Sequence, residues 1–353
     1  MLSAIGEGVE RYAASIWQES HLVRKCLSEI RDRAFDPNWL VLYGAEQYAR
    51  PGFAFSPLNQ NLQLNWTIGR WLDSSQEVFL PAQATYLGFT EDSSLIAQST
   101  SNGLATGQSF EDAALRAVYE LVERDAFMMY WLTGRSAERI DVSSCDELCR
   151  YSIESIRRLG ADTEMYVLDY GIGIPTVLCL GLGDGVEWPG VTIGLGTHSD
   201  INVACRKAAL EQGHYGPYMR RLMKQQRHSR INNPEDVVGS LDHGLYYCRR
   251  EPVVALDRLR QAKCSVTVAN LNSHYRDQST LDSCIARLSM AAIRIAAVDL
   301  TTPDLKPSGL SVVRAFGTYL QPIHFGYGYE RRDNPRFKAL LTGTLNSLPH
   351  PMA

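Results

Sequence analysis

The sequence predicts a mixed α/β fold, because helical and strand-like segments alternate along the chain. A length of 353 residues is enough for one large domain or two packed lobes. Apolar residues make up 45% of the chain and charged residues 21%, which is typical of a soluble globular protein. Since no stretch reads as a linker, we expect residues 1–353 to form one domain.

Hydrophobic periodicity places the individual elements. A helical period predicts helices over residues 1–32, 110–133, 146–159, 203–227 and 276–295. Short apolar runs predict strands over residues 163–170, 174–182, 190–197, 265–272, 293–300 and 310–317. The first helix has neither a capping residue nor a lead-in, so either it starts the protein or upstream residues are missing.

A ten-residue pattern occurs twice, as AIGEGVERYA at 4–13 and as AVYELVERDA at 117–126. Six of the ten positions are identical at an offset of 113 residues, which is far too long a period for a solenoid. The repetition predicts equivalent glutamate-bearing helices in two pseudo-symmetric halves. A weaker third copy, AALEQGHY at 208–215, aligns Glu211 with Glu120 and places His214 at the second glutamate position.

Charge and cysteine content exclude several classes of protein. The net charge of −4 gives no general attraction to nucleic acid or to a membrane surface. The basic segment at 219–230 is either a solvated helix end or a face turned toward a phosphate ligand and a partner. The eight cysteines are scattered without metal-finger spacing, which favours reduced thiols in a cytoplasmic protein. No apolar run approaches the roughly 20 residues of a membrane span, and the start shows no signal-peptide pattern.

Acidic and basic residues share one stripe of the helix predicted over 110–133. At 100° per residue this stripe contains Asp112, Arg116, Glu120, Glu123 and Arg124. Like charges about 6 Å apart repel by roughly 3 kcal/mol at an effective dielectric of about 20. A cation between them would reverse the sign. The alternative is a solvated helix face with local Glu–Arg pairs, but the repeat of the pattern favours a shared cation site.

The first helix carries the same arrangement at Glu7, Glu10 and Arg11. Glutamates without cysteine and with little histidine are hard oxygen ligands that suit magnesium, which usually accompanies phosphate. The loop SNGLATGQSFEDA at 101–113 precedes the second glutamate helix, and Ser109 with Asp112 forms a capping-box pattern there. Such a helix start can hold phosphate oxygens. A di-iron bundle is a rival for the acidic pattern, and the six strand-like runs argue against it.

These residues resemble the signature of the YcaO family. The similar segments are SAIGEGVERYAA near the start, SNGLATG…SFEDAALRAVYELVERDAF in the middle, and residues 298–326 with LNSLPHPMA at the end. Residues 298–326 and the terminal segment LNSLPHPMA resemble the azoline-forming branch of the family. The resemblance implies an ATP- and Mg2+-dependent cyclodehydratase that converts Cys, Ser or Thr of a ribosomally made precursor peptide to thiazoline or oxazoline. Other members of the family install thioamides or amidines.

The resemblance also assigns roles to individual positions. The implied magnesium ligands are Glu7, Glu10, Asp112, Glu120 and Glu123. The implied nucleotide-binding residues are Gln108, Arg11, Arg124, Glu211 and Arg221. Asp112 replaces a usual glutamate, Gln108 a common asparagine and His214 an expected glutamine. The usual proline-rich end PxPxP reads here as PxPxA, and the chain starts after the family's upstream lysine- and glycine-containing stretch.

The resemblance implies a separate E1-like or ThiF-like protein that delivers the peptide, and it is compatible with a homodimer. Two other functions stay open at this point. The same catalyst could make thioamides from a sulfur donor, or the chain could be a non-catalytic scaffold that binds a precursor or partner. None of the cysteines is marked as a nucleophile, and no general base is visible. We expect His350, in the tail, to be a surface residue. The resemblance, in which the tail lies close to the active site, leaves open a catalytic contribution from His350 or the terminal carboxylate.

Overall fold

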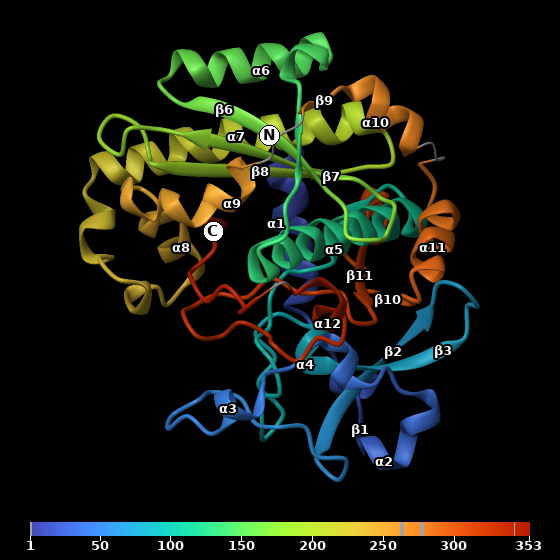
Figure 1. Ribbon diagram of the computed structural model, residues 1–353. Helices are drawn as coiled ribbons and strands as arrows, with labels where there is room; N and C mark the ends of the chain where they lie inside the picture. The colour runs from blue at the N-terminus through green and yellow to red at the C-terminus, as the bar shows by residue number, and fades with distance from the viewer. Residues whose placement is uncertain (1, 262–264, 276–278, 342) are drawn as a thin grey trace. The chain divides into compact units, whose positions relative to one another are not determined.

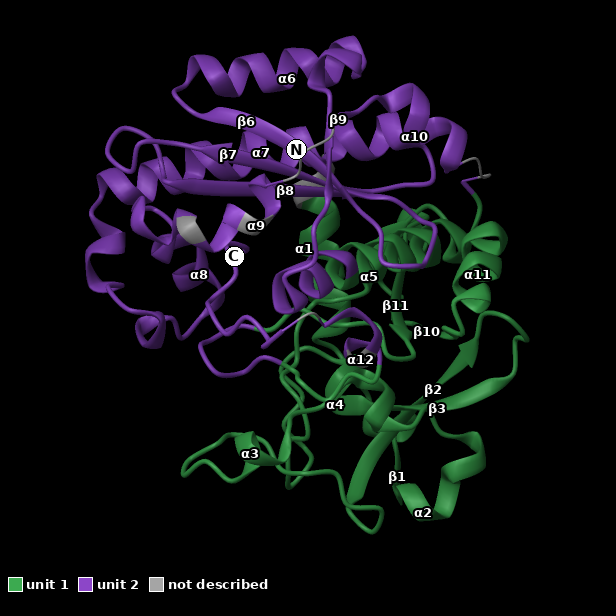
Figure 2. Cartoon of the chain, viewed as in Figure 1, with its two compact units in different colours: residues 1–125, 280–324, 331–335 green, residues 126–279, 325–330, 336–353 purple. Residues whose placement is uncertain are grey.

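The chain divides into two compact units, which Figure 2 shows in different colours. The computed structural model describes residues 2–261, 265–275, 279–341 and 343–353. Unit 1 comprises residues 1–125, 280–324 and 331–335, and unit 2 comprises residues 126–279, 325–330 and 336–353. The boundary at 125/126 falls inside a long helix, α5 (Phe110–Thr133). The single domain expected over 1–353 stays a prediction, and the two units are described separately below.

Unit 1 is built on a sheet with the strand order β1-β2-β10-β11-β4, in which β3 also pairs with β2. The neighbouring strands are antiparallel at every described pairing. The strands are β1 (Val23–Cys26), β2 (Gln63–Trp71), β3 (Glu77–Pro81), β4 (Leu104–Gly107), β10 (Ile295–Asp299) and β11 (Ser311–Gly317). The central strands β10 and β11 therefore come from the far end of the sequence, and β4 lies at an edge.

Aromatic and aliphatic side chains fill the core beside this sheet. Phe35 stacks on Trp71 with ring centroids 5.8 Å apart and also contacts Phe316 on β11. Val9 of α1 packs against the same cluster, which fixes that helix to the sheet. The helices of unit 1 are α1 (Leu2–Ala14), α2 (Leu27–Ile30), α3 (Ala45–Tyr48), α4 (Ala82–Thr85), α11 (Leu281–Met290) and the first part of α5.

Unit 2 contains a second sheet, with the strand order β8-β7-β6-β5-β9. Its strands are β5 (Glu138–Ile140), β6 (Asp162–Leu168), β7 (Thr176–Leu182), β8 (Val191–Thr197) and β9 (Ser265–Val266). The pairings from β5 to β8 are antiparallel, and β5 pairs with β9 in parallel. Helices α6 (Glu147–Arg158) and α7 (Ile201–Lys224) lie side by side on one face (Figure 1). The other helices are α8 (Ser240–Tyr246), α9 (Asp257–Arg260), α10 (Val268–His274) and α12 (Phe337–Leu340).

Glycines let α7 approach β8 very closely. A Cβ atom at Gly194 would lie 2.3 Å from the carbonyl oxygen of Ala208, and one at Gly196 would lie 2.2 Å from that of Ala204. Both contacts are with helix backbone, which cannot move aside as a side-chain end can. The sequence GLG at 194–196 is therefore a packing requirement that fixes the distance between strand and helix.

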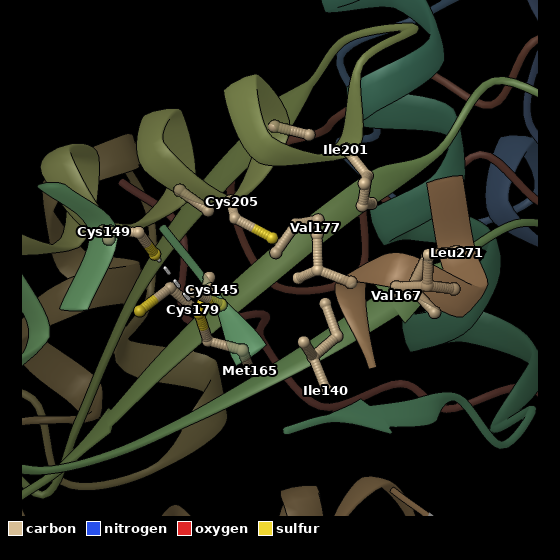
Figure 3. Packing of buried hydrophobic residues seen from close by; sticks show 14 of the residues in the cluster. Ile140, Cys145, Cys149, Met165, Val167, Val177, Cys179, Ile201, Cys205 and Leu271 are labelled. Atoms are coloured by element: carbon tan, nitrogen blue, oxygen red, sulfur yellow. Dashed lines mark hydrogen bonds between the residues drawn. The ribbon is translucent and has the colours of Figure 1, made fainter. Parts of the chain in front are cut away.

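Four cysteines lie in the apolar core between α6, α7 and this sheet (Figure 3). Cys145, Cys149, Cys179 and Cys205 are at most 4% exposed. They pack with aliphatic side chains such as Val177. All seven cysteines in the described part of the chain are free thiols. Buried free cysteine behaves as a small apolar residue, so these thiols act here as core.

Three sequence predictions need correction. The helix predicted over 1–32 ends at Ala14, and residues 23–26 instead form β1 on β2. The strand predicted over 265–272 ends at Val266, because the Thr267 side chain accepts the N–H of Asn270 and caps α10. The helix predicted over 276–295 is α11 (Leu281–Met290), and its predicted start at 276–278 lies outside the described residues. Across the described ranges, no helix is long and apolar enough to cross a membrane.

Candidate functional site

The two glutamate-bearing helices of unit 1 adjoin the same edge strand, β4. From α1, the Glu10 carboxylate accepts the Thr106 N–H at 2.8 Å, and the Thr106 hydroxyl donates to the Gly6 carbonyl at 3.3 Å. At this same end, β4 runs almost directly into α5. A Cβ atom at Gly107 would lie 2.3 Å from the Ala113 nitrogen, so only glycine permits this turn. Both copies of the repeated sequence pattern thus adjoin the C-terminal end of one short strand.

Each copy of the pattern forms an ion pair between its first glutamate and its arginine, four residues apart. Arg11 lies 2.7 Å from Glu7, with side chains 63% and 60% exposed. Arg124 lies 3.7 Å from Glu120, with side chains 20% and 23% exposed. The same local geometry therefore exists once at the surface and once in a partly buried setting. The two copies share this local ion pair, but both lie in unit 1 and not in separate halves of the chain.

Glu120 carries a charge that the surrounding protein disfavours. Burial raises the pKa of Glu120 to about 7, against the attraction of Arg124, and the carboxylates of Glu123 and Glu10 add to the rise. Burial likewise raises the pKa of Glu10, although the Thr106 N–H bond opposes it. Glutamates from α1 and α5 are therefore close enough to repel each other. A bound cation would relieve that repulsion.

The start of α5 is closed by its own residues. The Ser109 hydroxyl accepts the Asp112 N–H at 3.2 Å, as the capping pattern predicted. The Asp112 carboxylate accepts the Gln108 N–H at 3.0 Å and the Arg116 Nε–H at 3.0 Å. Burial would raise the pKa of Asp112, but these two hydrogen bonds outweigh it and lower the pKa. Both oxygens of Asp112 already have partners, so as a metal ligand it would have to exchange one of them.

Arg314 on β11 is a residue of this region that the sequence analysis did not single out. Its side chain is 4% exposed, and its positive charge acts on Glu120. Burial lowers the pKa of Arg314 to about 10, and Glu120 opposes the shift. The signal in the sequence was a single arginine inside the otherwise apolar strand SVVRAFG. A charge at such a position is costly unless it has a counter-charge, so it marks a polar site behind the strand.

The third copy of the pattern lies in unit 2. The Glu211 carboxylate on α7 accepts the Leu195 N–H of β8 at 2.5 Å. Since β8 is the edge strand of its sheet, this contact parallels that of Glu10 with β4. His214 and Arg221 are exposed on α7. Binding of the same nucleotide by Glu211 and Arg221 stays a prediction.

The C-terminal tail is anchored in unit 2, and the expectation that His350 is a surface residue is wrong. His350 is 0% exposed and stacks on His243 with ring centroids 4.1 Å apart. His243 donates from Nδ1 to the His350 carbonyl at 2.9 Å and accepts the Gly326 N–H at Nε2 at 3.0 Å. Tyr247 donates to the Pro349 carbonyl at 2.6 Å. These bonds hold the tail by its backbone, and aromatic packing around His350 excludes water.

The residues of unit 1 fit a magnesium ion with a phosphate ligand better than a preformed metal cage. In the described part of the chain, no group of three or more His, Cys, Asp or Glu side chains is already arranged to hold a metal ion. Magnesium is usually bound through one or two carboxylates together with waters and substrate phosphates. Glu10 and Glu120 supply such carboxylates, and Arg124 adds a cation next to them.

Three solved structures of known proteins share this fold. A heterocyclase in complex with substrate and cofactor matches with a TM-score of 0.79 and 22% identity, over 99% of this chain and 48% of its own. YcaO from Methanopyrus kandleri, bound with AMPPCP and Mg2+, matches with a TM-score of 0.63 and 20% identity, over 91% and 75%. The E. coli microcin synthetase McbBCD complex with pro-MccB17 bound matches with a TM-score of 0.62 and 16% identity, over 90% and 77%. The chain spans about half the length of the heterocyclase.

A protein-family model supplies the assignment. The model described as YcaO cyclodehydratase, ATP- and Mg2+-binding, matches residues 1–318. The matched span includes both copies of the glutamate pattern, the edge strand β4 between them, and Glu211. The chain therefore belongs to the YcaO family of cyclodehydratases, whose cofactors are ATP and Mg2+.

Proposed function

We propose that this protein is a peptide cyclodehydratase that uses ATP and Mg2+ to form azoline rings in a ribosomally made precursor. The observation that carries the proposal is the pair of glutamate helices that meet at β4. Glu10 and Glu120 repel each other there, and Arg124 lies beside Glu120. Phosphoryl transfer is mainly positioning and neutralisation of charge, so acids, magnesium and arginine suffice for it.

We assign the proposed ligands by side-chain chemistry. Glu7, Glu10, Asp112, Glu120 and Glu123 would hold magnesium, and Gln108, Arg11, Arg124, Glu211 and Arg221 would contact the nucleotide. The half-buried Glu10 and Glu120 are the best placed of the carboxylates, because their charge is least well solvated in the protein alone. The exposed Glu7 is already paired with Arg11 and is the weakest of the proposed ligands.

In the proposed reaction, the side chain of a Cys, Ser or Thr attacks the carbonyl carbon of the preceding amide. The side chain loses its S–H or O–H proton in this attack, and the former carbonyl oxygen takes the γ-phosphoryl group of ATP, which leaves ADP. This oxygen then departs as inorganic phosphate while the amide nitrogen loses its proton, and the C=N bond of the ring forms. When bound, ATP with Mg2+ supplies the phosphoryl group that makes this oxygen a good leaving group. The role of the glutamates and arginines is to bind and orient these charged groups and to neutralise them.

The proposed substrate and partners are supported by proteins of the same fold. Among proteins of the same fold, one heterocyclase is known with a substrate and a microcin synthetase is known as a complex with pro-MccB17. We propose a peptide substrate here, a separate E1-like or ThiF-like protein that binds its leader, and a cytoplasmic location. Product mass distinguishes azolines from thioamides, because each ring makes the peptide lighter by one water whereas oxygen-to-sulfur exchange makes it heavier.

The decisive experiment measures ATP binding and hydrolysis with and without Mg2+ on the purified protein. We expect Mg2+-dependent binding in the wild type and loss of ATP use in Glu120→Gln and Glu123→Gln, with unchanged circular dichroism. Glu111→Gln is the matched control, because Glu111 is an exposed acid on the same helix. Full ATP turnover in either site variant would refute the magnesium assignment. A folded wild-type protein that binds no ATP would favour the non-catalytic scaffold.

A further inference from the structure

A small cavity in unit 1 is lined by two buried arginines. Arg314 of β11 and Arg331 are each 4% exposed, and both face a cavity of about 50 Å³. Apolar side chains, among them Ile96, Leu121 and Leu320, form much of the remaining wall. Nucleotide-sized ligands occupy pockets of about 300–1,000 Å³, so this cavity is too small to be the ATP site.

The hydrogen bonds of both guanidinium groups leave several donors unused. Arg314 donates from Nη2 to the carbonyls of Ala84 at 3.0 Å and Thr100 at 2.6 Å. Arg331 donates from Nη1 to Leu40 at 3.2 Å and from Nη2 to Gln98 at 2.6 Å. Arg314 Nε, Arg314 Nη1 and Arg331 Nε are buried and have no partner within the described residues. A buried donor without a partner costs about 1–3 kcal/mol, and more when it is charged.

Two like charges lie close together in this region. Arg331 lies close enough to Arg314 to disfavour its positive charge, and Glu120 is the acid that favours it. Glu120 is not reserved for Arg314, because it also pairs with Arg124. Water in the cavity could accept the unused N–H groups, but it would leave the repulsion between the two guanidinium groups in a poorly polarisable interior.

We propose that this cavity binds one monatomic anion, chloride under physiological conditions, between Arg314 and Arg331. A halide accepts hydrogen bonds from several directions, so it can use donors of both guanidinium groups. Its size suits a space of about 50 Å³, which holds only a few water-sized particles. The cavity lies next to the proposed ATP and Mg2+ site, because Arg314 interacts with Glu120, but anion binding between the two arginines requires neither ATP nor Mg2+.

The test measures stability against urea at constant ionic strength while chloride replaces gluconate. For one site, each tenfold rise in chloride above its dissociation constant increases the folding equilibrium constant about tenfold. We expect this dependence in the wild type and its loss in Arg331→Met. Arg33→Met is the matched control, because Arg33 is an exposed arginine of the same unit and should leave the dependence intact. Equal stability in chloride and gluconate for the wild type would overturn the proposal.

A second measurement keeps the test valid if Arg331→Met fails to fold. Wild-type crystals soaked in sodium bromide should show an anomalous peak in the cavity between the two guanidinium groups. Water alone in that position would overturn the proposal, and so would binding of phosphate but not of bromide. Neither experiment involves ATP, so a failure here is independent of a failure of the proposed cyclodehydratase function.

Discussion

At the scale of single residues, Glu120 shows how a binding site and a stable protein make opposite demands. Its carboxylate is mostly buried beside other acids, which raises its pKa to about 7. Asp184 is the contrasting case, an exposed acid whose pKa is lowered to about 2 by three backbone N–H groups that donate to it. The fold favours the charge of Asp184 and disfavours the charge of Glu120, which is what we expect of a carboxylate that would bind a cation.

Glu120→Gln should therefore stabilise the protein without ligand while removing its ATP use. The folded-state pKa of Glu120 is raised, so its ionisation destabilises the fold as the pH rises from about 4.5 through about 7. We expect the variant to be more stable than the wild type by about 1–3 kcal/mol at pH 8 and nearly equal at pH 5. Urea unfolding at both pH values measures this. Glu111→Gln, the exposed control, should be neutral at both, and a destabilised Glu120→Gln at pH 8 would contradict the assignment.

At the scale of elements, each sheet has an edge strand whose backbone is bound by a glutamate from a helix. Glu10 of α1 accepts an N–H of β4, and Glu211 of α7 accepts an N–H of β8. The sequence repeat aligned Glu211 with Glu120, but its contact resembles that of Glu10. A sequence repeat predicts which helix positions are equivalent. Which strand each side chain contacts depends on tertiary packing, which the repeat does not determine.

Glu10 and Glu211 should each tolerate Gln better than Ala. Gln keeps an oxygen that accepts the strand N–H, whereas Ala leaves that N–H without a protein partner at a cost of about 1–2 kcal/mol. We expect Glu10→Ala and Glu211→Ala to lose that much stability relative to the matching Gln variants. Urea unfolding of the four variants measures the difference. Equal stability of Ala and Gln at either position would show that the contact contributes nothing.

The His243–His350 contact makes the anchoring of the tail sensitive to pH. Burial lowers the pKa of His243 from 6.5 to about 4, so the unfolded chain binds more protons between these values. Stability should therefore fall as the pH drops from 6.5 to 4, by up to about 3 kcal/mol from this group. His243→Gln should flatten the pH profile of the unfolding free energy. The exposed His214 provides the control, and an unchanged profile in His243→Gln would refute the attribution.

Much of the fold and part of the site could be predicted from the sequence. The helix predicted over 110–133 has the bounds of α5, because its apolar period and start are local features. The prediction that the first helix continues beyond Ala14 was wrong, because residues 23–26 pair with β2 instead. Such a long-range contact cannot be predicted from local hydrophobic periodicity. The strand over 265–272 failed although its capping residue, Thr267, was visible. Arg314 was missed because its interaction with Glu120 joins residues that are far apart in the sequence.

At the scale of the whole molecule, the two units differ in whether the strands of their sheet come from one continuous stretch of the sequence. All strands of the unit 2 sheet, β5 to β9, come from residues 138–266. The unit 1 sheet instead places β10 and β11, from residues 295–317, between β2 and β4. The first 125 residues thus supply the outer strands of this sheet, and its central strands come from residues 295–317.

Fragments of the chain should reflect this difference. A fragment of residues 126–279 keeps every strand of its sheet and should fold, at lower stability because it lacks the buried tail. A fragment of residues 1–125 lacks β10 and β11, so β4 has no strand to pair with and the fragment should stay unfolded. Backbone amide NMR spectra of the two fragments measure this. A dispersed spectrum from residues 1–125 would contradict the dependence of that sheet on its late strands.

The late arrival of β10 and β11 also matters during synthesis on the ribosome. After residue 125, about 190 more residues must be made before β11 is complete, which takes roughly 10–40 s at 5–20 residues per second. During that interval the β2–β3 hairpin exposes apolar side chains and an unpaired strand edge, a combination that promotes aggregation. Production of this protein should therefore depend on chaperones that bind nascent chains, and its yield should respond to translation speed between codons 126 and 317.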